Sequence, residues 1–451
     1  MRQKVLIWLA STAITLSMFC IGATAQDPIP LPELDSKRLL NGLQITVASS
    51  TNFADEMAIG LGLRYGAAFD SEDKGGGANL LSRLFMTATI DRTLEGIQAE
   101  LSYLNATLEV SCDWDGFRFL MRGKNSTWER ALLLLYQVVA EAQFREEAFA
   151  AEKQAVIEDL SRPADPRRKI HTQFESVLFS GTTYGRPLEG TAASVSTLRL
   201  GDLRLFYRKY FTPSQASLHI VGNVPPLEVL SKASRIWGIW VSQDDIPFTF
   251  LPPRQPAGRK IFLEDDPDSP AAQFITGSLF PRRQDTVFEN ASLAVNILQE
   301  RLTELLPTSL VTANHEGRRL AGPFYIQGQA AAEQAVDEIR KIQNAVEQMK
   351  TTLVSDEELE SAKTARIEAF NRQMMSVDGI CNIMMDSEIY RLGSIYTVAF
   401  PDRIRRCSPE SIRKAAVDWI MPSGEILLIR GAAAALKQDL SSLGTVQDLL
   451  P

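Results

Sequence analysis

Histidine and cysteine are scarce in this chain of 451 residues. The three histidines, His171, His219 and His315, are far apart, and the four cysteines include no Cys-x-x-Cys pair. Thiolate metal sites need clustered cysteines, so a site of that kind is not expected. We expect no histidine to have a second metal ligand at helical or strand spacing, and His219 to be a core or edge residue of a strand. Little therefore remains for metal or acid–base chemistry.

The cysteines offer at most one disulfide. Cys112 lies in a strand-like stretch and is expected to be a small buried apolar residue. Cys381 and Cys407 could pair in an oxidising compartment, and their spacing leaves this open.

Blocks of positive charge are also absent. Lys and Arg number 47 against 55 for Asp and Glu, which gives a formal net charge of −8. Without a basic surface the chain cannot neutralise phosphates, so nucleic acid is not an expected partner. The sign is also wrong for binding an anionic membrane surface.

The N-terminus carries the one long apolar run. Arg2 and Lys4 precede the mostly apolar residues 5–22, and Ala23-Thr24-Ala25 supplies the small residues of a cleavage site. We predict that residues 1–25 are a signal peptide. An uncleaved anchor is the alternative, because about 18 apolar-leaning residues nearly span a bilayer. The mature protein is expected to be exported, to the periplasm or the extracellular space, with no membrane segment after cleavage.

An internal repeat organises the remaining chain. Residues 145–162 align with 355–372 at a shift of 210, and residues 211–222 align with 420–431 at a shift of 209. The identical pairs are Glu147/Glu357, Lys153/Lys363, Ala155/Ala365, Ile157/Ile367, Glu158/Glu368, Arg162/Arg372, Pro213/Pro422, Ser214/Ser423, Leu218/Leu427, Ile220/Ile429 and Gly222/Gly431. Two independent windows with nearly the same shift predict a tandem duplication.

The two halves are predicted to be separate domains. Four prolines between residues 247 and 258 cannot continue a helix or join a sheet, so this stretch reads as a stiff extended linker. We therefore predict an N-terminal domain at 33–240, a linker at 241–258 and a C-terminal domain at 259–450.

Hydrophobic periodicity predicts an α+β fold. In the first half, strands are expected at 43–48, 57–63, 108–110, 117–121 and 218–221, and helices at 80–87, 128–142 and 146–160. Runs of strands followed by runs of helices predict, in each half, helices packed on one face of a mostly antiparallel sheet.

Several segments resemble the M16 peptidases, the family of insulysin, pitrilysin and the mitochondrial processing peptidase. Thr183-Tyr184-Gly185-Arg186-Pro187-Leu188-Glu189-Gly190-Thr191 is similar to the family's HPYGRPxxGT signature. Asn41-Gly42-Leu43 is similar to its opening NGL, and Gly322-Pro323-Phe324 to its GxF strand entry. The resemblance covers about residues 35 to 450. It implies a half-length, bacterial-type member whose chain forms two homologous α/β sandwich domains. Two such chains are then expected to enclose a chamber that admits peptides.

Active members of that family bind zinc through HxxEH on a helix and a glutamate from a later helix. In this chain the resemblance places Asn79 at the first ligand, Ser82 at the water-polarising glutamate and Arg83 at the second ligand. The later carboxylate is Asp159, and Glu152 lies seven residues earlier on the same helix face. An amide is a poor zinc ligand, a hydroxyl is no base near neutral pH, and a guanidinium stays cationic. The zinc site is therefore predicted to be lost, with no catalytic residue, no bound metal and no cofactor.

Two further expectations concern charge and catalysis. Arg83 could replace the zinc electrostatically by pairing with Asp159 or Glu152, although both acids could equally form a solvated helix face. The second half is also expected to lack the family's Arg-x6-Tyr pair, which steadies the tetrahedral intermediate, because residues 305–310 occupy that stretch.

The resemblance implies a non-catalytic subunit that binds peptides or walls the chamber. Asn105 and Ala106 mark the strand edge where the family adds an extended peptide, although an ordinary turn before a strand fits them as well. Expected partners are an active, HxxEH-bearing M16 subunit, as a heterodimer, or a second copy, as a homodimer. The alternatives are a structural scaffold or a stand-alone peptide-binding protein. An active hydrolase with another site is the least expected, since no GxSxG, Cys/His constellation or P-loop occurs.

Overall fold

The computed structural model describes residues 32–241, 246–269, 271–393 and 395–449. The predicted signal peptide at residues 1–25 lies outside these ranges. No helix within them is long and apolar enough to cross a membrane.

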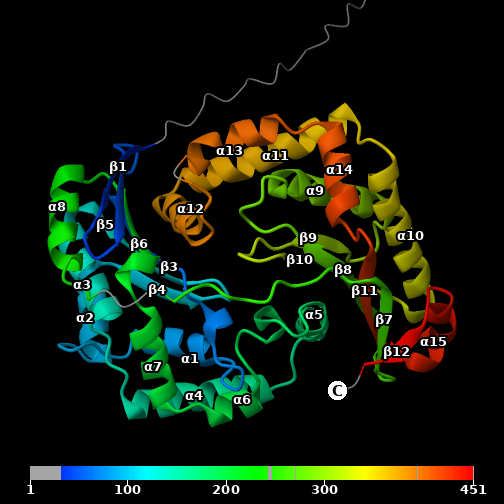
Figure 1. Ribbon diagram of the computed structural model, residues 1–451, viewed down its shortest axis with the longest axis horizontal. Helices are drawn as coiled ribbons and strands as arrows, with labels where there is room; N and C mark the ends of the chain where they lie inside the picture. The colour runs from blue at the N-terminus through cyan, green and yellow to red at the C-terminus, as the bar shows by residue number, and fades with distance from the viewer. Residues whose placement is uncertain (1–31, 242–245, 270, 394, 450–451) are drawn as a thin grey trace, which may run out of the picture. The chain divides into compact units, whose positions relative to one another are not determined.

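The first half contains one six-stranded sheet in the order β1-β2-β6-β3-β5-β4 (Figure 1). Its strands are β1 (Glu33–Arg38), β2 (Gln44–Ser49), β3 (Glu56–Leu63), β4 (Thr107–Cys112), β5 (Phe117–Lys124) and β6 (Ala216–Gly222). Its α-helices are α1 (Gly77–Leu84), α2 (Leu94–Leu104), α3 (Trp128–Ala140), α4 (Glu146–Ser161), α5 (Pro166–Leu178), α6 (Ala192–Thr197), α7 (Leu200–Tyr210) and α8 (Pro226–Trp237). Short 3-10 turns are η1 (Ala67–Phe69), η2 (Asn125–Thr127), η3 (Thr183–Gly185) and η4 (Pro213–Gln215).

The second half repeats this plan with the order β12-β7-β11-β8-β10-β9. Its strands are β7 (Gly258–Asp265), β8 (Ala272–Phe280), β9 (Thr312–His315), β10 (Gly322–Ala330), β11 (Gly424–Gly431) and β12 (Val446–Asp448). Its helices are α9 (Phe288–Leu305), α10 (Ala332–Thr351), α11 (Asp356–Met374), α12 (Val377–Ile389), α13 (Tyr396–Arg405), α14 (Pro409–Trp419) and α15 (Ala433–Ser441). The predicted duplication thus has a structural counterpart, since α4 and α11, and β6 and β11, hold equivalent places.

Both sheets are mostly antiparallel, as predicted. In the first, β2 and β6 form the parallel pair, and the other neighbours run antiparallel. In the second, β7 runs parallel to both β11 and β12, and β8, β10 and β9 follow in antiparallel order. Residues 246–257, between the halves, form no helix or strand.

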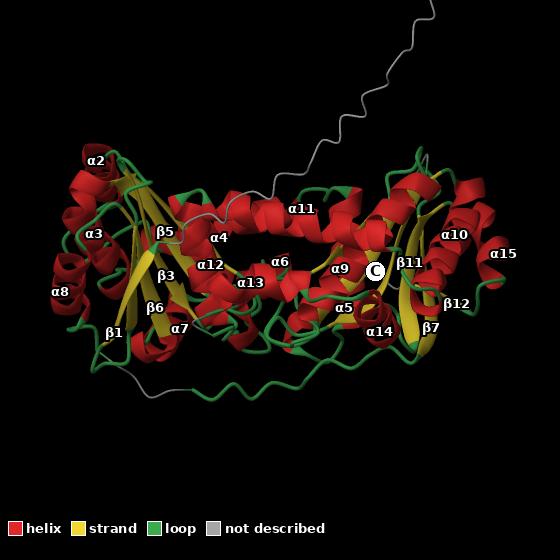
Figure 2. Ribbon diagram, turned by 90° about the horizontal axis from the view of Figure 1, so that it is seen from above, coloured by secondary structure: helices red, strands yellow, loops and turns green. Residues whose placement is uncertain are grey.

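The expectation that helices cover one face of each sheet is incomplete, because each half lends a helix to the other. In Figure 2, α3 and α8 lie on one side of the first sheet, and α12 of the second half lies on the other. Conversely, α10 and α15 pack on the second sheet from one side, while α5 of the first half contacts β8 and β11. The two lent helices are repeat equivalents, so the exchange is reciprocal.

Small residues in the sheets permit this exchange. A Cβ atom added at Gly60 in β3 would lie 2.4 Å from Cys381 Sγ of α12, and one added at Gly277 in β8 would lie 2.9 Å from the ring of Phe174 in α5. The missing side chains let the helices approach the strands closely. Interdigitated cores of this kind join the halves, and the described residues form one compact unit.

The cysteines in the described part of the chain are free thiols. Cys112, Cys381 and Cys407 are all buried, so Cys112 is a small core residue as predicted. The disulfide considered between Cys381 and Cys407 is not formed. His219 is also a core residue, 2% exposed in the middle of β6.

Candidate functional site

Helix α1 carries Asn79, Ser82 and Arg83, the residues that the resemblance places at zinc-site positions. Its first turn is anchored by Asp70, whose carboxylate accepts hydrogen bonds from the backbone N–H groups of Gly76 (3.2 Å) and Ala78 (2.9 Å). These N–H groups have no partner inside the helix, so a carboxylate at this end is favourable. Burial nevertheless raises the pKa of Asp70 to about 7. Asp70 thus stabilises the start of α1.

Asn79, Ser82 and Arg83 are poorly suited to bind a metal ion. Ser82 is buried, and its hydroxyl donates to the backbone oxygen of Asn79 at 2.7 Å. The amide oxygen of Asn79 is buried without a hydrogen-bond partner among the described residues. Arg83 follows one turn after Asn79, with its side chain 38% exposed. An amide, a committed hydroxyl and a guanidinium do not fit a zinc ion.

Arg83 does reach a carboxylate of the neighbouring helix α4. Its Nη1 lies 3.9 Å from Oε2 of Glu152, whereas Asp159 contacts Arg162 at 3.1 Å. Of the two partners considered, Glu152 is therefore the one within reach. The Glu152 side chain is 35% exposed, so the pair is half-solvated rather than buried. A pair of this kind contributes about 0–1 kcal/mol, far less than a buried one.

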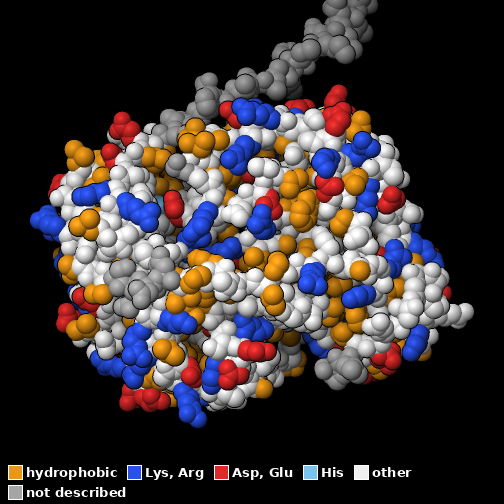
Figure 3. Space-filling view, in the orientation of Figure 1, with side chains coloured by type: hydrophobic (Ala, Val, Ile, Leu, Met, Phe, Trp, Pro, Cys, Tyr) orange, Lys and Arg blue, Asp and Glu red, His pale blue; other side chains and the backbone are white. Residues whose placement is uncertain are grey.

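A cleft of about 620 Å³ opens beside Arg83. It is lined by the end of α4, by α5 and by the segment 187–192, which holds part of the signature that resembles the M16 family. Its lining mixes basic and acidic side chains, with Arg168 2.7 Å from Glu189, while Lys169 bonds to Glu264, which lies outside the lining. The volume is typical of ligand sites. Figure 3 likewise shows charges of both signs interspersed over the face in view.

Asn105 and Ala106 lie where α2 turns into the edge strand β4. Asn105 has φ 47°, the left-handed conformation that ends α2, and is exposed. Within the described residues β4 pairs with β5 alone, which leaves one side of its backbone open. Helix α1, which carries Arg83, contacts β4. Both the turn and the edge-strand interpretations of these residues are compatible with this geometry.

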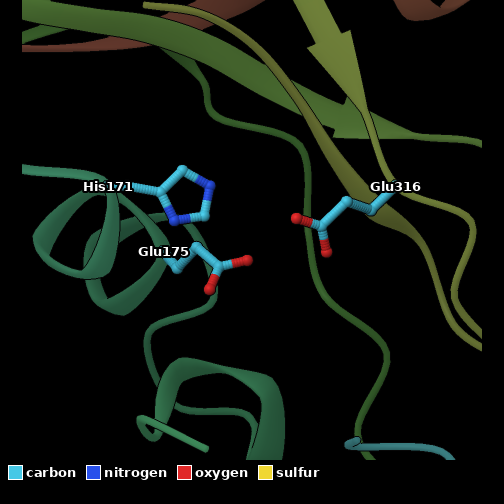
Figure 4. Close-up of side chains that lie close together, drawn as sticks. All are labelled: His171, Glu175 and Glu316. Carbon is cyan, nitrogen blue, oxygen red and sulfur yellow. The ribbon is translucent and has the colours of Figure 1, made fainter. Parts of the chain in front are cut away.

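A polar cluster was missed in the sequence, where His171 was expected to be isolated. Glu175 lies one turn after His171 on α5, and Glu316 follows β9 in the second half (Figure 4). One potential ligand atom from each residue lies within 4.8 Å of the others. The His–Glu spacing of four was visible in the sequence, but Glu316 joins only through the helix exchange.

Arg318 binds both carboxylates of this cluster. Its Nη2 donates to Oε2 of Glu316 at 2.6 Å and to Oε1 of Glu175, and its guanidinium lies 4.0 Å from the ring centre of Trp114. Arg318 is 3% exposed. Burial raises the pKa of Glu175 to about 7, although Arg318 favours its charged form. The imidazole of His171 is partly buried, which lowers its pKa.

The expectation that the second half has no Arg-x6-Tyr pair is wrong, because one pair of residues has this spacing. Six residues separate Arg318 from Tyr325, and the pair lies well after the residues 305–310 considered for it. Tyr325 is partly exposed in β10, with its ring centre 4.7 Å from that of His171. Burial raises the pKa of the Tyr325 hydroxyl to about 12, so the group remains protonated near neutral pH.

Comparison with protein families gives two matches along the chain. Residues 46–192 match the model "Insulinase (Peptidase family M16)", and residues 197–366 match "Peptidase M16 inactive domain". The two segments together cover more than half of the chain and adjoin one another in the order of the domains.

Curated relatives are similar at low identity. An uncharacterised zinc protease of Rickettsia bellii is 23% identical over 44% of this chain and 48% of its own length. A probable mitochondrial-processing peptidase subunit beta of Arabidopsis thaliana is 22% identical over 54% of this chain and 46% of its own length. The match thus spans about half the length of these relatives.

A solved structure shows the same fold. The crystal structure of a peptidase M16 inactive domain from Pseudomonas fluorescens superposes with a TM-score of 0.81 at 17% identity, covering 89% of this chain and 98% of that one. With the two family matches in the same order as the two sheets, the chain belongs to the M16 peptidase family.

Proposed function

We propose that this protein is an exported, catalytically inactive M16 homologue that acts as the non-catalytic subunit of an M16 peptidase complex. The observation that carries the proposal is the residue set Asn79, Ser82 and Arg83 on α1, which the resemblance to the family assigns to the ligand and base positions. Several relatives bear the name zinc protease, and the proposal sets this chain apart from them on those residues.

The chemistry of the substituted residues supports inactivity. A zinc peptidase needs two imidazoles, a carboxylate ligand and a base to polarise the attacking water. Here Arg83 lies within ion-pair distance of half-solvated Glu152, and its guanidinium repels a divalent cation from the same space. No step of zinc-dependent hydrolysis can be assigned to these residues.

The second half supports a role beside an active partner. In the proposed function the chain lacks the zinc ligands but keeps the Arg-x6-Tyr spacing. It would then retain the residues that steady the tetrahedral intermediate and not those that bind zinc. Tyr325 is partly exposed, whereas Arg318 is bound to Glu175 and Glu316, so Arg318 would have to leave these carboxylates to contact a substrate. A homodimer would lack zinc ligands on both sides, which favours an HxxEH-bearing partner for any catalysis.

Peptide is the ligand that the first half suits best. The open edge of β4 offers backbone groups for an added strand, and α1, whose Arg83 borders the cleft, contacts β4. Hydrogen exchange on the mature chain, with and without a set of unstructured peptides, tests this. We expect peptide to protect the amides of β4 (Thr107–Cys112). No protection anywhere would favour the scaffold alternative.

The partner role has its own test. The chain is purified from its native source under mild conditions, and copurifying proteins are identified. We expect an M16 chain with HxxEH, and peptidase activity in the mixture that neither chain shows alone. An HxxEH chain that is fully active by itself and does not bind this protein would contradict the proposal.

A further inference from the structure

We propose that His171, Glu175 and Glu316 form a site for a divalent transition-metal ion of the zinc class, separate from the degenerate position on α1. His171 and Glu175 belong to α5, and Glu316 belongs to the segment after β9. Figure 4 shows the imidazole beside the carboxylate of Glu175, with the carboxylate of Glu316 facing them across a short gap. The proposal rests on this geometry and not on the proposed function.

The distances are within reach of coordination. One ligand atom from each residue lies within 4.8 Å of the others, whereas ligands of a tetrahedral zinc ion are roughly 3.4 Å apart. Rotation of the two glutamate side chains would close this difference. One imidazole and two carboxylates are a donor set that zinc accepts in proteins, with water as a fourth ligand.

An unsatisfied imidazole nitrogen points independently to a ligand. Nε2 of His171 is shielded from solvent and has no hydrogen-bond partner among the described residues. A buried nitrogen without a partner is costly, and a metal ion would satisfy it.

The charge of the cluster is not balanced. Glu175 and Glu316 bring two negative charges, while Arg318 brings one positive charge to the same place. Arg318 occupies one oxygen of each carboxylate and leaves the other oxygen of each available. Glu175 is buried, whereas the Glu316 side chain is 38% exposed, so water screens part of the remaining negative charge and a bound cation would balance it. A divalent ion bound to the free oxygens meets this need and joins α5 of the first half to the second half.

The metal site is tested by zinc binding to the full mature chain. The protein is stripped with a chelator, dialysed, and titrated with Zn²⁺ alone, with calorimetry and metal analysis as readouts. We expect one Zn²⁺ per chain and a rise in Tm at saturation, because the ion binds only the folded state. His171→Gln and Glu316→Gln should each weaken binding by at least about 10-fold.

Matched variants locate the ion. Glu152→Gln and Asp159→Asn alter the carboxylates near Arg83 and should leave the stoichiometry and affinity unchanged. Each variant is first compared with the wild type in its metal-free Tm, so that loss of binding is separated from loss of folding. Glu175 is left intact because it neutralises buried Arg318.

Three outcomes would overturn the proposal. They are no stoichiometric binding by the wild type, binding that His171→Gln does not change, and binding that Glu152→Gln abolishes. The readout is metal content and not cleavage, so such a failure leaves the proposed subunit role to its own test.

Discussion

At the scale of single residues, Arg83 decides how far the zinc site has changed. A guanidinium cannot bind zinc, and here it faces Glu152 at 3.9 Å across a half-exposed surface. The electrostatic replacement of the metal by Arg83 is therefore weak. If the zinc site is lost, as we propose, this half-exposed pair does not replace it with a buried ion pair.

A double-mutant cycle on Arg83→Ala and Glu152→Ala measures this pair. Because both side chains are more than one third exposed, we expect a coupling free energy below about 1 kcal/mol in chemical denaturation. Arg162→Ala with Asp159→Ala is the matched surface pair. A coupling of about 3 kcal/mol or more for Arg83 and Glu152 would show that the pair is buried.

Buried histidines should make the protein sensitive to acid. Burial lowers the pKa of both His219 and His315 to about 3, with Arg366 and Arg283 contributing at His315. Since the unfolded chain binds these protons near pH 6.5, stability is lost as the pH falls from about 6.5 towards 3. At pH 5 each histidine should cost about 2 kcal/mol.

The measurement is the free energy of unfolding at several pH values between 7 and 4. His219→Leu should flatten the pH dependence, whatever its effect on stability at pH 7. An unchanged slope in this variant would mean that His219 takes up its proton in the folded protein.

At the scale of elements, α1 is anchored at its first turn by a buried carboxylate. Asp70 holds the first turn through two backbone N–H groups, and its side chain is 9% exposed. Asp70 thus acts as a structural support for the start of α1.

Replacement of Asp70 tests this anchor. We expect Asp70→Ala to lower the free energy of unfolding by about 1–2 kcal/mol, because the N-terminal N–H groups of α1 lose their acceptor. Asp73→Ala, at an exposed position in the same loop, should change it by less than about 0.5 kcal/mol. Equal effects of the two substitutions in denaturant titrations would contradict the role of Asp70.

The exchange of α12 makes an equally specific prediction at Gly60. An added Cβ would lie 2.4 Å from Cys381 Sγ and 2.9 Å from Met385 Sδ. Gly60→Ala should therefore cost about 1–3 kcal/mol through overpacking. The second substitution Cys381→Ala should recover part of this loss, since it removes the nearest atom.

Gly201→Ala provides the control in the same assay. A Cβ at Gly201 meets no atom within 4 Å, so this substitution in α7 should be neutral or slightly stabilising. If Gly60→Ala were as harmless as Gly201→Ala, α12 would not pack on β3 as described.

At the scale of the whole molecule, the sequence predicted the duplication, the mostly antiparallel sheets, and β2 to β6, α1, α3 and α4 of the first half, but not β1, α2 or α5 to α8. These follow from periodicity and from repeated residues such as Lys153 and Lys363. The reciprocal helix exchange did not follow, because an amphipathic pattern shows that α5 and α12 bury one face but not against which sheet.

The candidate site was predictable only in part. Asn79, Ser82 and Arg83 could be placed by resemblance, whereas the cluster of His171, Glu175 and Glu316 depends on contacts between the halves. The spacing of Arg318 and Tyr325 is visible in the sequence, but the pair lies after residues 305–310, where the resemblance placed it.

The most direct test of the account is peptide cleavage by the isolated mature chain supplied with Zn²⁺. We predict no cleavage of unstructured peptides above the background of a boiled sample, and no change when a chelator is added. Cleavage that a chelator abolishes, and that Zn²⁺ then restores, would contradict the loss of the zinc site.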